Sequence, residues 1–252
     1  MTNDSSGTGH ASYSVIVVGG GVAGLSAAVF TARHGLETLV VDAGESILRR
    51  NAHLENFPGF PAGVNARRLL DLLGEQAEAA GCERVKGTVV RVVEIDDGSG
   101  FIVKTDAGDR YPTEYVVAAT KNELDYMADV DGVGIIDRGK AFVDVDEYGR
   151  TGIEGLYAAG RIAEKAHQTV VAAGHGAEVG LAILEDDDRP FYHDWVAPQG
   201  YFTHRGRDLP PGCEEIDDAE RDRRESNAMS VMQDRFAERH PDEQETHPSL
   251  DG

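Results

Sequence analysis

Short apolar runs alternate with stretches of small or amphipathic sequence over the first two thirds of the chain. Residues 14–18 are almost entirely apolar and stop at three glycines, and a second apolar run covers 38–41. Runs of this length predict strands that are buried on both faces of a parallel sheet. Between them, small and apolar residues over 22–34 predict a helix that ends at Gly35. The chain is therefore expected to begin with a β-α-β unit.

This pattern continues to about residue 186. Leucines at 69–73 give residues 65–80 one apolar helical face, and residues 168–184 predict a second long helix. Asp97-Gly98 predicts a hairpin turn, whereas residues 121–140 have no period and are expected to form a loop. Further strands are expected at 88–94, 101–105, 115–119, 141–145 and 155–159.

Beyond residue 186 the pattern changes. Residues 189–212 carry prolines, aromatics and histidines without a period, and 217–238 predict a charged helix with few apolar positions. Polar sequence at 1–12 and 240–252 predicts a flexible tail and a disordered end.

These elements predict an α/β domain over residues 13–186, with a central parallel sheet and a small antiparallel β insertion, and a C-terminal extension over 187–252. A chain of 252 residues with 40% hydrophobic residues and 30 glycines suits such a domain. No apolar run reaches bilayer length and no leader-like segment opens the chain, so no membrane association and a cytoplasmic location are expected. Cys82 and Cys213 form neither a CxxC pair nor a metal-ligand spacing.

The formal net charge of −21 is the most unusual bulk property. Acidic residues are spread along the whole chain, whereas a mimic of nucleic acid would more naturally concentrate them on one face. Adaptation to a high-salt cytoplasm (a halophilic protein) fits better, because dense counterions screen the self-repulsion. The charge argues against nucleic acid or an anionic membrane as a partner.

The candidate chemistry begins at Gly19-x-Gly21-x-x-Gly24, which joins the first predicted strand to the first helix. In this context the first glycine permits a tight turn, the second lets the backbone approach a pyrophosphate, and the third allows close packing. The helix N-terminus presents free N–H groups to the phosphates. Asp42 follows Gly19 by 23 residues and ends the next strand, where it can accept from a ribose hydroxyl. A Rossmann-like FAD/NAD(P)-binding domain is predicted, rather than a glycine-rich turn without a ligand.

Four stretches of the sequence indicate whether the bound dinucleotide is NAD(P) or FAD. Residues 19–28, 55–60, 115–120 and 151–174 together resemble, in the correct order, the thioredoxin reductase-like family of FAD-dependent oxidoreductases. The resemblance implies that the cofactor is FAD. It implies cofactor-binding roles for Gly19, Gly21, Val22, Ala23, Gly24, Asp42, Ala43, Asn51, Val90, Ala119, Thr120, Gly160, Arg161, His167, Gln168 and Thr169.

The chain also departs from that family. The family inserts a nicotinamide-binding domain with a redox CxxC where this chain has only residues 121–140, far too few for a domain. The resemblance therefore implies an FAD domain whose electron donor is external: a ferredoxin, NAD(P)H or a small dithiol. A homodimer is also expected, and the extension is expected to cover the open flavin face or to contact a second subunit. The alternatives are a non-catalytic nucleotide-binding scaffold or regulator, and an NAD-binding protein.

Two single positions differ as well. Arg161 replaces the family's Asp and is predicted to pair with the FAD pyrophosphate, the alternative being an ion pair with Glu164 or Asp42. Lys121 replaces a Gly. Both departures favour the scaffold alternative. Asn51 lies in a segment that resembles the dithiol-oxidase branch of the family, although a polar surface loop is an equal interpretation.

Three histidines, His53, His167 and His175, fall in segments that the resemblance places near the cofactor. His167 begins the last helix of the domain, whose positive end in this family faces the flavin and stabilises its anionic reduced form. His167 is therefore the candidate catalytic residue, handling a proton beside the flavin, with helix capping as the alternative. No ligand spacing predicts a metal.

Overall fold

The computed structural model describes residues 12–96, 98–246 and 249. Most of the expected N-terminal tail, Asp97 of the expected hairpin turn, and positions 247, 248 and 250–252 lie outside the described residues. The strands and α-helices are β1 (Tyr13–Val18), α1 (Val22–Arg33), β2 (Thr38–Asp42), α2 (Ala66–Ala79), β3 (Glu83–Lys86), β4 (Val89–Glu94), β5 (Phe101–Thr105), β6 (Arg110–Ala118), β7 (Ile135–Asp137), β8 (Ala141–Val143), β9 (Leu156–Ala158), α3 (Thr169–Asp186), β10 (Trp195–Pro198), β11 (Cys213–Ile216) and α4 (Asp218–Phe236).

The central sheet is mostly parallel, as the apolar runs predict. Its parallel part has the order β3-β2-β1-β6-β9, and the first half of β6 pairs antiparallel with β5, which pairs antiparallel with β4. Side chains of β1 alternate between two cores: Val15 and Val17 face one, and Ile16 and Val18 face the other. Because both faces are covered, the strand is apolar at every inner position.

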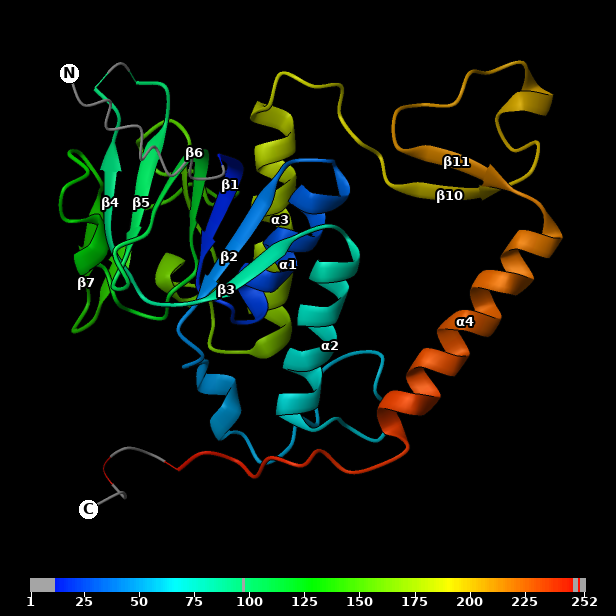
Figure 1. The fold of residues 1–252 in the computed structure, drawn as a ribbon, viewed down its shortest axis with the longest axis horizontal. Helices are drawn as coiled ribbons and strands as arrows, with labels where there is room; N and C mark the ends of the chain where they lie inside the picture. Colours follow the sequence, from blue (N-terminus) through cyan, green and yellow to red (C-terminus); the bar gives the residue numbers. More distant parts are fainter. Residues whose placement is uncertain (1–11, 97, 247–248, 250–252) are drawn as a thin grey trace, which may run out of the picture.

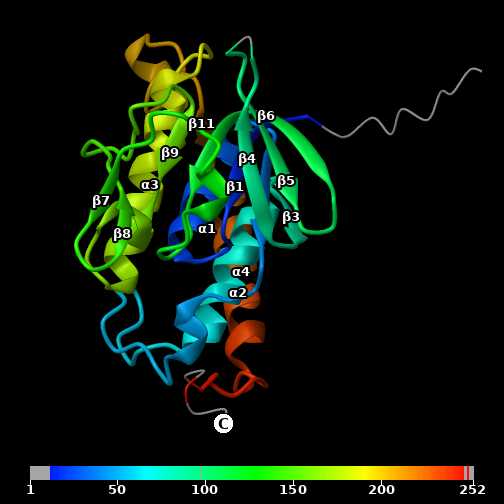
Figure 2. The ribbon, with the colours of Figure 1, turned by 90° about the vertical axis from the view of Figure 1, so that its left-hand side faces the viewer.

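The helices α1, α2 and α3 cover one face of this sheet, while β4, β5 and the segment before β7 lie toward the other (Figures 1 and 2). The α1 and α3 helices pack closely because α3 carries Gly176 at the crossing. A Cβ at this position would overlap the backbone of Ala23 on α1. This close packing brings the first turns of both helices to the same edge of the sheet.

The interval expected to be a loop contains more structure than its sequence suggests. A 3₁₀ turn at Asp125–Met127 buries Tyr126 and Met127 against the sheet, and β7 pairs antiparallel with β8. This small hairpin is the only sheet structure that the described residues form between β6 and β9. Since β6 and β9 are neighbouring parallel strands, with Val116 opposite Leu156, the segment between them is a crossover connection within one sheet.

The C-terminal extension forms an arm beside the domain (Figure 1). Residues 189–212 are not wholly irregular, because β10 pairs in parallel with β11 over an aromatic cluster. Within this cluster the ring centroids of Trp195 and Tyr201 are 4.8 Å apart. The α4 helix follows, and none of its residues is buried.

The described part of the expected disordered end lies along the domain. The His240 Nε2 atom is 2.8 Å from a carboxylate oxygen of Asp71, and the Glu245 amide donates to the Arg49 carbonyl oxygen over 3.1 Å. These contacts are polar and so leave no apolar pattern in the sequence. Among the described residues, no helix combines the length and apolarity that a bilayer crossing requires.

Candidate functional site

A cavity of about 680 Å³ opens where β1, β2 and β6 end. The Gly19 amide donates to the Val41 carbonyl, and the Ala119 amide donates to the Val18 carbonyl, each over 2.9 Å. These bonds hold the three strand ends together. Ligands of open α/β sheets bind at this edge, and the volume lies within the usual range for ligand sites, about 300–1,000 Å³.

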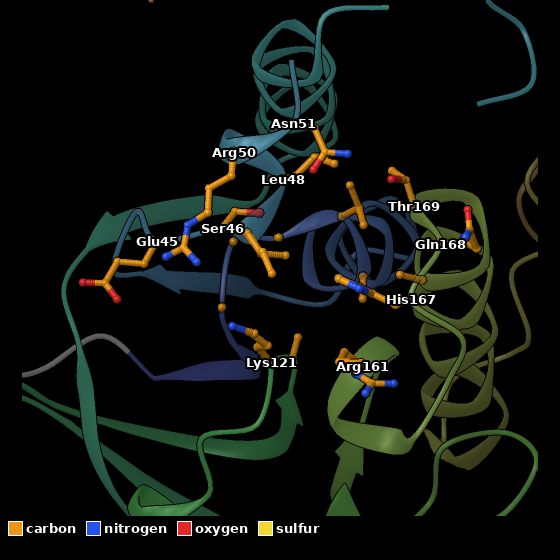
Figure 3. Close-up of a pocket in the computed structure, with 18 of the residues that line it drawn as sticks. Glu45, Ser46, Leu48, Arg50, Asn51, Lys121, Arg161, His167, Gln168 and Thr169 are labelled. Atoms are coloured by element: carbon orange, nitrogen blue, oxygen red, sulfur yellow. The ribbon is translucent and has the colours of Figure 1, made fainter. Parts of the chain in front are cut away.

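The glycine-rich turn forms one end of the cavity (Figure 3). Gly19 has a φ of +114°, which only glycine adopts readily. The α1 helix starts directly after the turn, with Gly21 at its N-cap, no capping side chain and no acidic residue in its first turn. Its first helical bond runs from the Leu25 amide to the Gly21 carbonyl, so the preceding amides are available to an anion.

Asp42 stands at the end of β2 beside this turn. One of its carboxylate oxygens accepts a hydrogen bond from the Gly44 amide over 2.8 Å, which fixes the side chain. A Cβ at position 20 would overlap the Asp42 carboxylate, so Gly20 lets the carboxylate lie against the turn. This is the position from which a carboxylate accepts from the ribose of a bound dinucleotide.

A second helix N-terminus forms the other end of the cavity. The α3 helix begins after Gln168 without a capping side chain and without an acidic residue in its first turn. The Gln168 Oε1 atom instead accepts from Asn56 Nδ2 over 2.9 Å, joining two segments that both line the cavity. His167 is exposed and also lines it. An anionic or electron-rich group is therefore favoured at both ends.

Buried Arg67 on α2 holds the loop that forms one wall. Its guanidinium donates to the carbonyl oxygens of Arg49, Asn51 and Ala52 over 2.9, 2.8 and 3.4 Å. Its Nε has no hydrogen-bond partner among the described residues. Sequence reasoning missed Arg67 because its position among the polar residues of an amphipathic helix suggests a surface side chain.

Arg161 lies at the edge of the cavity with Lys121. Its guanidinium carbon is 5.0 Å from the centre of the Phe142 ring, and its Nη1 donates to the Lys165 carbonyl over 3.4 Å. Within the described residues no ion pair joins Arg161 to Glu164 or Asp42, and Glu164 instead pairs with Arg138 at 2.9 Å. The side chain of Arg161 therefore lies free of carboxylates within the described residues, and its pairing with the FAD pyrophosphate stays a prediction.

His175 lies behind the cavity wall and does not line the cavity. Its Nδ1 accepts from the Gly160 amide over 3.0 Å, which requires the neutral ring with its proton on Nε2. Burial lowers the pKa of His175 to about 4, and the charge of Lys165 contributes to the shift. The ring therefore supports the turn that carries Arg161. His53, by contrast, lines the cavity and is 2.6 Å from Glu55.

The cavity brings together most of the residues predicted from the sequence. Those that line it are Gly19, Gly21, Val22, Ala23, Asp42, Ala43, Asn51, Ala119, Thr120, Arg161, His167, Gln168 and Thr169. Gly24 and Gly160 lie behind it at close-packed backbone positions. Val90 is exposed on β4, at a shift of register in its pairing with β5, and does not line the cavity, so the cofactor-binding role predicted for it is not supported by its position.

Other lining residues were missed by sequence reasoning. They include Glu45, Ser46, Arg50, Asn56 and Glu123, which come from loops on either side of the glycine-rich turn. Asn56 belongs to a segment that carries the family resemblance and could have been found from it. Arg50 directly precedes Asn51 in the segment that resembles the dithiol-oxidase branch. Glu45, Ser46 and Glu123 have no sequence signal, since their proximity depends on the path of each loop.

Comparisons with known proteins agree on the cofactor. A family model described as an FAD binding domain (FAD_binding_2) matches residues 14–53. The thioredoxin reductase of Aquifex aeolicus is 41% identical over 80 residues, which are 31% of this chain and 25% of that protein. That of Streptomyces coelicolor is 37% identical over 115 residues, which are 43% of this chain and 34% of that protein. The match to the FAD binding domain supports FAD as the ligand.

Solved structures agree on the fold. A thioredoxin reductase from Gloeobacter violaceus superposes with a TM-score of 0.65 at 18% identity, covering 73% of this chain and 98% of that one. The enzyme from T. acidophilum gives 0.62 at 17% identity, covering 69% and 98%. The fold is therefore that of a Rossmann-like FAD-binding protein. In sequence, the chain spans about a quarter to a third of the length of the curated relatives it matches.

Proposed function

Because the chain is related to the thioredoxin reductase-like FAD oxidoreductases, we propose that it binds FAD in this cavity and catalyses an FAD-dependent redox reaction. One observation carries the proposal. The glycine-rich turn, Asp42, the end of β6 and the start of α3 come from distant parts of the sequence and line a single cavity. A dinucleotide needs an anion site, a ribose acceptor and a site for its ring system, and this cavity offers all three.

Residues at different positions along the cavity are proposed to bind different parts of FAD. The free amides of α1 would hold the pyrophosphate, with Arg161 as a second contact, and Asp42 would accept from the adenosine ribose. Ala119, Thr120 and the α3 N-terminus would position the ring system. Bound FAD supplies the electron transfer, and His167 would hold or deliver a proton beside it.

The electron donor would be a separate molecule. Between β6 and β9 the described residues form only a short turn and a small hairpin, which is too little for a nicotinamide-binding domain. The two cysteines, Cys82 and Cys213, are far apart in the sequence and form no CxxC. The candidate donors are a ferredoxin, NAD(P)H and a small dithiol. We further propose that the protein is cytoplasmic and adapted to high salt. It would consist of an FAD-binding domain over residues 13–186 and an extension over 187–252, and it would form a homodimer.

The absorbance spectrum of the purified protein tests the FAD proposal first. A flavin spectrum with about one FAD per chain is expected, followed by bleaching when the matching donor is added without oxygen. A colourless protein that takes up no added FAD would contradict the proposal. Each donor class is tested separately, so that the same experiment identifies the reductant.

A non-catalytic nucleotide-binding protein is the second candidate, favoured by Arg161 and Lys121 at the cavity edge. In that case FAD would bind but no donor would reduce it at a useful rate. Stopped-flow reduction of the bound flavin therefore distinguishes the two candidates.

A further inference from the structure

A second cavity of about 400 Å³ adjoins the first, and we propose that it binds the carboxylate or phosphate group of a small anionic redox substrate beside FAD. We call it the basic cavity. The proposal rests on the proposed function, because it assigns the substrate class of the same site. The polar residues that line it are Arg50, Asn51, Lys121, Asn122, Lys140, Arg161 and His167.

The charge of the basic cavity is opposite to that of the protein. Its lining has four permanent cations and no carboxylate, in a chain whose formal net charge is −21. Figure 3 shows Arg50 on one side of the opening and Lys121 and Arg161 on the other. An anion between them would relieve their mutual repulsion and make charge-assisted hydrogen bonds with them.

These cations also form no ion pair with a carboxylate among the described residues. Ten described arginines form ion pairs with carboxylates, among them Arg33, Arg150 and Arg224. Within the same described part of the chain, the four cations of the basic cavity form none. In a protein with almost twice as many acidic as basic residues, 45 against 24, four such cations around a cavity that no carboxylate lines form a local basic site.

The walls of the basic cavity are held by the fold. Asn122 Nδ2 donates to the Ala141 carbonyl over 3.1 Å, and Arg161 lies over the Phe142 ring. The Asn51 carbonyl on the opposite wall is held by buried Arg67. The cations therefore project from supported backbone, which lowers the entropic cost of ordering them around a ligand.

FAD alone does not account for all of these cations. Gly19 and Asp42 line only the first cavity, whereas Asn122 and Lys140 line only the basic cavity. The FAD pyrophosphate is assigned to the glycine-rich turn, and Gly19, Gly21 and Val22 of that turn do not line the basic cavity. Because Lys140 lines only the basic cavity, a substitution at Lys140 can distinguish a substrate site from a part of the cofactor site.

The test compares wild type, Lys140→Glu and the matched control Lys104→Glu, which makes the same charge change on β5, outside both cavities. Each FAD-loaded protein is titrated with pyrophosphate and, separately, with citrate, at constant ionic strength, while the flavin spectrum and thermal stability are followed. We expect equal binding to wild type and Lys104→Glu, and at least tenfold weaker binding to Lys140→Glu. The stronger of the two anions identifies phosphate or carboxylate as the preferred group.

Flavin content is measured in every sample, so the two proposals fail differently. A protein that takes up no FAD contradicts the proposed function, and the titration is then made on the protein without FAD. Binding of anions that disappears on FAD loading would overturn the inference, because the cations would then serve the cofactor. Equal affinities in Lys140→Glu and Lys104→Glu, or no binding to the FAD-loaded wild type, would overturn it as well.

Discussion

The four α-helices that the described residues form begin in two different ways. Asn65 caps α2 by accepting from the Arg67 and Arg68 amides over 3.0 and 3.2 Å, and Asp217 caps α4 by accepting from the Glu220 amide over 2.8 Å. The α1 and α3 helices have no such side chain. The capped helices begin away from the cavity, and the uncapped ones begin at it.

This difference indicates where the protein leaves room for a ligand. A side-chain cap stabilises a helix by about 1 kcal/mol, so both cavity helices forgo that contribution. In exchange their amides and the positive ends of their dipoles remain available to an anion. Caps are thus present where a helix serves only the fold, and absent where it is proposed to hold the cofactor.

Crowding the open end of α1 should have the largest effect. A Cβ at Gly24 would overlap the Gly19 carbonyl and lie 3.2 Å from the Ala119 Cβ, so Gly24→Val forces the turn apart. We expect unfolding to become easier by more than about 3 kcal/mol and FAD uptake to be lost, measured by urea denaturation and flavin content. Gly174→Ala, on α3 with open space around it, is the control and should be neutral or stabilising.

Mild acid should lower the stability of the part of the fold that contains α1 and α3, and should have little effect through α2 and α4. His34 ends α1 and His175 lies in α3, and burial lowers both pKa values, whereas α2 and α4 contain no histidine. A lowered pKa means that the unfolded chain takes up the proton first. Stability is therefore full above about pH 6.5 and falls toward pH 4, by at most about 3 kcal/mol for His175.

Denaturation midpoints at several pH values measure this loss. His175→Gln removes the titrating group and should flatten the profile over the same range. A profile that keeps its full slope in this variant would show that other groups carry the pH dependence.

Adding a side-chain N-cap to α3 should make it resemble the capped helices α2 and α4, and its first amides should become less available to a ligand. Gln168→Asp places a carboxylate at the N-cap, which should stabilise the FAD-free protein by about 1 kcal/mol and weaken FAD binding about tenfold, because the new charge faces the cavity. Gln168→Asn supplies the cap without the charge. If both variants weaken FAD binding equally, the loss comes from the broken contact with Asn56 rather than from the charge.

Removing a cap should have the smallest effect. Asp217→Ala should cost about 1 kcal/mol of local stability in α4, visible as faster amide exchange in its first turns. FAD affinity should not change, since Asp217 does not line the cavity. A change in flavin affinity would mean that the extension and the cavity are coupled.

The parts of the fold that could be predicted are those with a local signal. The apolar run before Gly19 predicted β1, and the leucine pattern at 69–73 predicted the helix that the structure places at Ala66–Ala79. The parallel pair β10 and β11 could not be predicted, because Trp195 and Tyr201 stabilise it through ring contacts that follow no period.

The site divides in the same way. The glycine-rich turn and Asp42 form a local motif with fixed spacing, so they could be found in one sequence. Arg50, Lys140 and Arg161 come from three separate segments and have no common motif. Their proximity follows from how the loops after β2, β6 and β9 converge, which only the folded structure specifies.

The adjacency of β6 and β9 has a consequence for protein engineering. The carboxyl ends of the two strands lie side by side, and the segment that connects the strands contains a hairpin that turns at Gly139, which is exposed and has open space around it. A foreign domain with close termini, such as a fluorescent reporter, should be accepted at this turn without disturbing the sheet. Such a fusion would place a sensor directly beside the cavity and report occupancy inside living cells.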